Sequence, residues 1–215
     1  MQTVFLIIDC LGVAAYSISG TLVGIRKQTD CVGALIFALL ASFGGGLIRD
    51  LILGITPPHL FWHPDYAIYL QVAVPVSLIW FHLAFFPRAA SLLERHKDDF
   101  LLSFFDTIGL ASFCVSGINV AIQNGYSSNY ALMIFCGCIT GVGGGILRDV
   151  VASRLPIIFR KDVYLLPTIA GAMLYVSTYR TIPRLFSTLL SMSFIIIMRL
   201  LAILLHWNFP THKES

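Results

Sequence analysis

Two copies of one short segment carry the residues of this sequence that could do chemistry. Each copy has the order GGGxxRD, at residues 44–50 and again at residues 143–149. Consecutive glycines weaken a helix by about 1 kcal/mol each relative to alanine, and a charged side chain inside a bilayer is costly unless it is paired or hydrated. Because the sequence repeats both penalties, we expect its functional site here. The candidate residues are Gly44, Gly45, Gly46, Arg49 and Asp50 in the first copy and Gly143, Gly144, Gly145, Arg148 and Asp149 in the second.

A glycine triplet in the middle of a membrane-spanning helix permits a kink or a short unwound turn. Unwinding would free carbonyl oxygens, which can replace part of the hydration shell of a cation. Irregular backbone survives at this depth only where it is buried in protein or lines water. The alternative is that the glycines merely let two helices pack closely. Since the triplet occurs twice, each time followed by Arg-Asp, we expect two kinked helices that line a pathway.

The arginine and the aspartate of each segment need partners. Neighbouring residues of a helix point about 100° apart, so Arg49 is not expected to face Asp50. Asp9, in the preceding apolar stretch, falls at a depth similar to that of Arg49, and the same holds for Asp106 and Arg148. We therefore predict two ion pairs, Asp9–Arg49 and Asp106–Arg148. They could be structural clasps, or they could border a wet path and gate it.

Other candidate sites have less support. His59 and His63 follow the second apolar stretch, but two histidines without a third ligand do not predict a metal site. Arg199 is expected to reach the interface by snorkelling. The glycine segments lack the GK[ST] ending of a phosphate loop, and neither HExxH nor a nucleophile elbow occurs. We expect no enzyme activity, no bound metal and no cofactor.

The elements that must position these residues are membrane-spanning helices. The chain has 215 residues, of which 57% are hydrophobic and 12% charged, and its mean hydropathy is +0.84. Soluble proteins contain about 25% charged residues. The net charge of +3 is small and its basic residues are scattered, so no nucleic-acid partner is expected. Apolar stretches of about the 20 residues that a bilayer requires fall at 3–24, 31–53, 66–86, 101–122, 128–151, 162–179 and 185–206.

The first three spans resemble the next three. The residues that recur 97 positions later are Asp9, Gly12, Ser19 and Gly20, as Asp106, Gly109, Ser116 and Gly117, whereas GGGxxRD recurs after 99. Because each unit crosses the membrane three times, the second unit must enter from the opposite face, and such inverted repeats are typical of transport proteins. The Ser-Gly pairs predict close helix contacts, either within a protomer or between subunits.

The expected organisation is an all-α membrane protein of seven transmembrane helices, arranged as two inverted three-helix repeats plus a seventh helix. Its parts are a first repeat at 1–86, a cytoplasmic linker at 87–100, an inverted second repeat at 101–179, and a seventh helix with a cytoplasmic tail at 185–215. Loops on one side carry nine basic residues and loops on the other carry two, which places the N-terminus outside and the C-terminus in the cytoplasm.

The doubled GGGxxRD segment, the span count and the inverted repeat resemble the prokaryotic branch of the trimeric intracellular cation (TRIC) channel family. The resemblance runs from about Val4 to His206. It implies a homotrimer in the inner membrane, with a separate pore in each protomer, lined by kinked second and fifth helices. The permeating ions would be monovalent cations, chiefly K⁺ with some Na⁺. Related bacterial proteins with the same motif are regarded as transporters of a small amino acid, glycine, and this alternative stays open.

Overall fold

The computed structural model describes residues 2–84, 100–160, 164–205 and 207, and this part of the chain is helical, without a strand. The long helices are α1 (Gln2–Arg26), α2 (Cys31–Ile52), α3 (Pro64–Leu83), α5 (Phe100–Ala121), α6 (Tyr130–Val151), α8 (Leu165–Thr178) and α9 (Arg184–Leu204). Three short helical segments join them, namely η1 (His59–Phe61), η2 (Ile122–Tyr126) and α7 (Ile157–Arg160). The expected linker at 87–100, apart from residue 100, lies outside the described residues, as do residues 206 and 208–215 of the expected tail.

The seven long helices match the seven expected spans, and the predicted fold class is confirmed. Six of them are long and apolar enough to cross a membrane, whereas α8 has only 14 residues. The second helices of the two repeats, α2 and α6, both begin with a side-chain cap. Asp30 caps the start of α2 by accepting from Gly33 N at 2.7 Å, and Asn129 caps α6 by accepting from Leu132 N at 3.0 Å.

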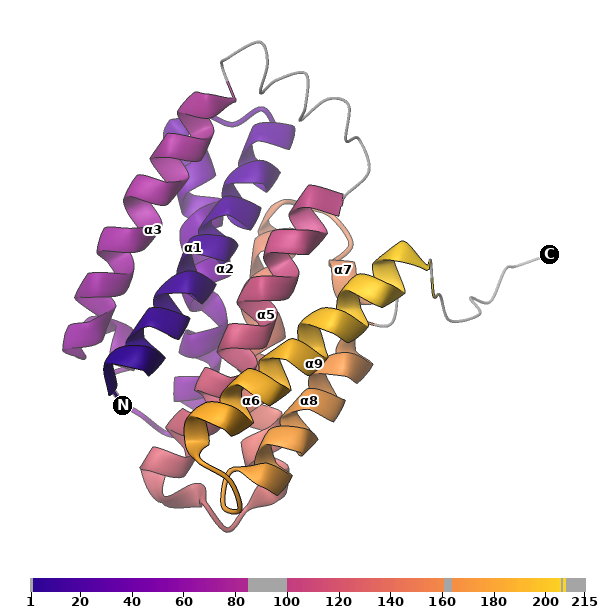
Figure 1. Ribbon diagram of the computed structural model, residues 1–215. Helices are drawn as coiled ribbons and strands as arrows, with labels where there is room; N and C mark the ends of the chain where they lie inside the picture. The colour runs from indigo at the N-terminus through magenta and orange to yellow at the C-terminus, as the bar shows by residue number, and fades with distance from the viewer. Residues whose placement is uncertain (1, 85–99, 161–163, 206, 208–215) are drawn as a thin grey trace.

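The two repeats pack against each other through their first two helices. α1 contacts α2, α3 and α5, and α2 contacts α6, so that α1, α2, α5 and α6 form the centre of the bundle. In the second repeat α8 packs on α6, and the seventh helix, α9, covers α5 and α8. Figure 1 shows α1 and α5 starting from opposite ends of the molecule, as an inverted repeat requires.

The glycine triplets lie where α2 crosses α6, and both helices continue through them without an interruption. Of the two forms that the triplets permit, the short unwound turn is therefore absent from both helices. A Cβ added to Gly45 would lie closer than 3.0 Å to the carbonyl oxygen of Thr140, and one added to Gly144 would lie equally close to that of Ala41. The two backbones touch, so the close-packing alternative explains the central glycines.

The glycines of the Ser-Gly pairs also make close helix contacts, and both contacts are within one protomer. Gly20 lies against the backbone of Ala38 in α2, and Gly117 lies against Cys136 and Thr140 in α6. Each repeat is thereby held together by a small residue at the same position of its first helix. Ser19 and Ser116, which precede these glycines, remain available for polar contacts.

Candidate functional site

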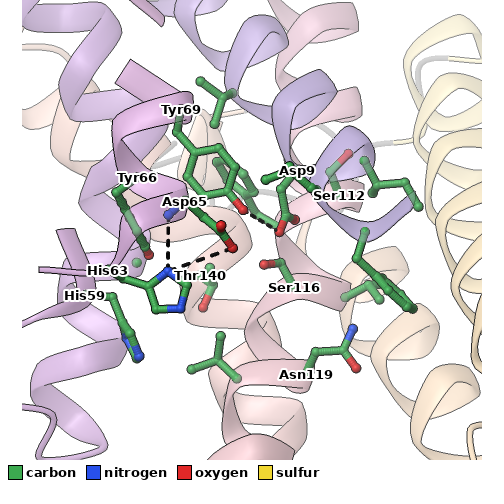
Figure 2. Close-up of a pocket in the computed structure, with 18 of the residues that line it drawn as sticks. Asp9, His59, His63, Asp65, Tyr66, Tyr69, Ser112, Ser116, Asn119 and Thr140 are labelled. Carbon is green, nitrogen blue, oxygen red and sulfur yellow. Dashed lines mark hydrogen bonds and ion pairs between the residues drawn. The ribbon is translucent and has the colours of Figure 1, made fainter. Parts of the chain in front are cut away.

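A cavity of about 680 Å³ enters the bundle at the end where α1 begins and α2 ends. We call this end of the molecule the open end. The cavity lies mainly between α1, α2, α3 and α5, and α6 contributes Thr140 alone to its lining. The exposed residues Thr3, Gln123 and Arg184 border it near the surface. Its polar lining includes Asp9, Gly46, Arg49, His59, His63, Asp65, Tyr66, Tyr69, Ser116 and Asn119, most of which appear in Figure 2.

Arg49 and Asp50 contact each other at the edge of this cavity. The Nε and Nη2 atoms of Arg49 donate to Asp50 Oδ1 at 2.9 and 2.7 Å, and Nη2 also donates to the hydroxyl of Tyr66 at 3.3 Å. The expectation that neighbouring residues could not meet is wrong, because the long arginine side chain folds back over the helix surface. Asp50 also accepts from the backbone N of His59 at 2.9 Å, which ties the segment after α2 to the helix.

Asp9 lies in the cavity without a cationic partner. Among the described residues no arginine, lysine or histidine forms a salt bridge with its carboxylate, so the predicted Asp9–Arg49 pair is absent from this structure. The hydroxyl of Tyr69 donates to Asp9 Oδ2 at 3.0 Å, and the Ser116 hydroxyl faces the same carboxylate (Figure 2). Arg49 is held away from Asp9 by Asp50 and Tyr66.

The equivalent cluster of the second repeat lies at the opposite end, which we call the closed end. Arg148 Nη1 contacts Asp106 Oδ1 at 3.1 Å and also donates to the hydroxyl of Ser19, so the predicted Asp106–Arg148 pair is confirmed. Tyr164 donates to the other oxygen of Asp106. The Arg148 and Asp106 side chains are both 0% exposed. A void of about 10 Å³ lies beside them, room for about one water molecule.

Asp149 plays the same local role as Asp50. Its Oδ1 accepts from Arg148 Nε at 2.8 Å and from Arg154, and its Oδ2 accepts from the backbone N of Ile157 at 3.0 Å. In both repeats the aspartate of GGGxxRD thus binds the neighbouring arginine and fixes the segment that follows the helix. This is a structural role. The contacts of the arginine differ between the two ends, because Arg148 also binds Asp106 and Ser19 whereas Arg49 binds Tyr66.

Arg199 lies inside the protein and does not snorkel, so that expectation is wrong. Arg199 is 1% exposed, and its guanidinium carbon lies 4.0 Å from the centre of the Tyr164 ring. None of its three side-chain nitrogens has a hydrogen-bond partner among the residues that the structure describes. The ring lies between this cation and Asp106, so Tyr164 links Arg199 to the closed-end cluster.

Replacing Arg199 by methionine is expected to raise the melting temperature of the purified protein by about 2–4 °C, because a buried cation that the described residues leave without hydrogen bonds is costly. The gain is limited by the lost cation–π contact. Thermal unfolding in detergent measures it, with the exposed Arg184→Met as a matched control that should leave the melting temperature unchanged. A fall in melting temperature for Arg199→Met would mean that an anionic group satisfies this arginine in the assembled protein.

The tyrosines of both clusters were missed by reasoning from the sequence. Tyr66 recurs 98 positions later as Tyr164, so the repeat carried the signal. Tyr69 has no such counterpart, because position 167 is a proline. Its contact with Asp9 follows only from the packing of α3 on α1.

Comparison with known proteins assigns this chain to a family. Residues 6–84 and 103–180 match the profile of the family described as glycine transporter. The UPF0126 inner membrane protein YadS of Escherichia coli is 32% identical over 206 residues, which cover 95% of this chain and 94% of YadS. A UPF0126 membrane protein of Deinococcus radiodurans is 40% identical over 167 residues, which cover 77% of this chain and 72% of the relative.

A solved structure has the same fold. The TRIC trimeric intracellular cation channel orthologue from Rhodobacter sphaeroides superposes with a TM-score of 0.82 at 28% identity, covering 95% of this chain and 99% of that one. The predicted resemblance to prokaryotic TRIC channels is confirmed. The chain is therefore a membrane protein of the glycine transporter (UPF0126) family, with the fold of the prokaryotic TRIC channels.

Proposed function

We propose that this protein conducts monovalent cations, K⁺ and also Na⁺, through a pore in each protomer of a homotrimer in the inner membrane. The observation that carries the proposal is the cavity at the open end. It reaches Gly46 beside the crossing of α2 and α6 and contains Asp9, a carboxylate without a cationic partner among the described residues. A partly buried carboxylate in a cavity that opens to the surface attracts cations. The likeness to TRIC cation channels supports the same function.

The pathway would continue from the cavity to the closed end, where the Arg148–Asp106 pair blocks it in this conformation. The proposed orientation puts the open end outside and the closed end in the cytoplasm, since the described basic loop residues of the closed end are Arg26, Lys27, Arg154 and Arg160. Conduction would then require the closed-end cluster to separate. The remaining glycines and charged residues of the two GGGxxRD segments would line the pathway or stabilise the helices that line it. They include Arg49, Asp50, Gly145 and Asp149.

A secondary transporter of a small amino acid such as glycine is the second candidate. The family description favours it, and so does one feature of the molecule. The cavity opens at one end of the molecule, and a buried cluster closes the other end. A carrier that works by alternating access has this arrangement when it is open to one side of the membrane. The walls of the cavity carry both a carboxylate and a guanidinium, which suit the two ends of a zwitterion.

Reconstitution of the purified protein separates the two candidates. A channel is expected to give unitary currents in a planar bilayer with symmetric KCl, whereas a carrier gives saturable uptake of labelled glycine into liposomes without resolvable current steps. Absence of both would overturn the proposal and its alternative together. Cross-linking of the protein in liposomes tests the trimer.

Asp9→Asn is expected to lower the K⁺ flux of these liposomes about tenfold, because it removes the charge that concentrates cations in the cavity. That factor corresponds to about 1.4 kcal/mol. Asp30→Asn is the matched control, since Asp30 caps α2 at the closed end and asparagine caps a helix equally well. An unchanged flux in Asp9→Asn would exclude Asp9 from the pathway.

A further inference from the structure

The two repeats place the same residues in two different arrangements. At the closed end, Arg148 contacts both Asp106 and Ser19, and the group is buried. At the open end, the counterparts of these three residues are Arg49, Asp9 and Ser116. All three line the cavity, and they are not joined in the same way. The arginine, aspartate and serine of this cluster thus contact one another at the closed end, whereas at the open end the arginine does not pair with the aspartate.

Resting on the function proposed above, we propose that the Asp9 carboxylate, with the hydroxyls of Ser116 and Tyr69, is a binding site for a monovalent cation, and that Arg49 replaces this cation when the open end closes. The cation is an alkali metal ion or the ammonium group of an amine. One carboxylate and two hydroxyls supply the oxygen ligands that such a cation prefers, without the charge excess that selects a divalent ion.

The site is accessible because of how its neighbours are arranged. Tyr69 donates its hydrogen to Asp9 Oδ2, and Asp9 and Ser116 lie side by side in the lining of the cavity (Figure 2). Arg49 is kept from the carboxylate by its contacts with Asp50 and Tyr66. Among the described residues of the open end, no cationic side chain therefore forms a salt bridge with Asp9.

Closure of the open end gives Arg49 the position that Arg148 has now. In the second repeat, the guanidinium binds the carboxylate and the serine hydroxyl, which are the same two groups that form the cation site in the first repeat. A cation at Asp9 and a guanidinium at Asp9 are thus mutually exclusive. The bound cation keeps the open end open, and the Arg49 side chain competes with this cation for the Asp9 carboxylate.

Binding is measured as a shift in melting temperature on adding KCl, NaCl or methylammonium chloride, with the ionic strength held constant by N-methyl-D-glucamine chloride. A ligand that binds only the folded protein stabilises it. Wild-type protein is expected to be stabilised by at least one of the three salts. Stabilisation by KCl or NaCl identifies an alkali ion as the ligand, and stabilisation by methylammonium alone identifies an ammonium group.

Three variants test the assignment. Asp9→Asn is expected to lose the salt-dependent shift, and Ser116→Ala, a milder change, is expected to weaken it. Arg49→Gln is expected to lower the cation concentration at half-maximal shift by about threefold or more, because the competing state is removed. Asp30→Asn, at the closed end, should behave as wild type.

The proposal is overturned if Asp9→Asn keeps the full shift, or if Arg49→Gln weakens the binding of these purely cationic probes. Folding of each variant is checked by its elution as a single species and by its helical circular dichroism. Failure of the proposed function gives a different result, namely a normal Asp9-dependent shift with neither currents nor uptake. Conversely, flux in liposomes without any Asp9-dependent shift rejects the cation site and leaves the transport function standing.

Discussion

Gly45→Ala is expected to destabilise the protein by about 3 kcal/mol or more, and Gly144→Ala should do the same. The added methyl group would lie closer than 3.0 Å to a backbone carbonyl oxygen of the facing helix. A backbone atom cannot rotate away as a side chain can, so α2 and α6 have to separate. Overpacking typically costs about 1–3 kcal/mol, and occasionally more.

Gly46→Ala is the matched control, because it changes the same residue type one position further along α2. The nearest atom to its added Cβ is the Tyr66 hydroxyl oxygen at 3.5 Å, an ordinary contact. This substitution is expected to leave the stability unchanged or raise it by up to about 1 kcal/mol, the difference in helix propensity. Unfolding by SDS in mixed micelles measures all three variants. Equal losses at Gly45 and Gly46 would mean that the triplet serves flexibility and not close packing.

Arg148→Gln is expected to cost about 3–5 kcal/mol, because it leaves Asp106 buried without a cation. Asp106→Asn combined with Arg148→Gln should recover part of this loss, so that the two changes couple by about 1–3 kcal/mol. The coupling is read from the free energies of unfolding of the two single variants and the double variant.

The first repeat supplies the matched cycle, with Asp9→Asn and Arg49→Gln. These residues correspond to Asp106 and Arg148 but do not contact each other in this structure, so their effects on stability are expected to add within about 0.5 kcal/mol. Strong coupling in the first repeat, or none in the second, would contradict the assignment of the open and closed ends.

The elements of this fold could be predicted from the sequence, because hydropathy and length alone locate helices that must cross a bilayer. The repeat could be found as well, since it preserves residue types at fixed offsets. Together with the matched depths of Asp106 and Arg148 in their spans, these two signals predict the contact between them that the structure contains. They also identified Asp9 and Arg49 as candidates, although not their separation.

The errors share a physical cause, which is that a sequence motif does not state how far apart two helices lie. The triplets could be hinges or contact points until the crossing of α2 and α6 is known. Likewise, Arg49 could turn to Asp9 or to Asp50, and the choice depends on whether a cavity separates α1 from α2. Two copies of one motif cannot reveal that they adopt different conformations, because their residues are the same.

The crossing of α2 and α6 has a mechanical consequence. Where two helices meet through side chains, tilting one against the other forces interlocked groups out of their rotamers. At Gly45 and Gly144 the nearest atoms of the facing helix are backbone atoms alone, so a small tilt of one helix against the other displaces no side chain at these two positions. The contact that excludes an added methyl group is thus also one at which α2 and α6 can change their crossing angle without a change of rotamer at Gly45 or Gly144.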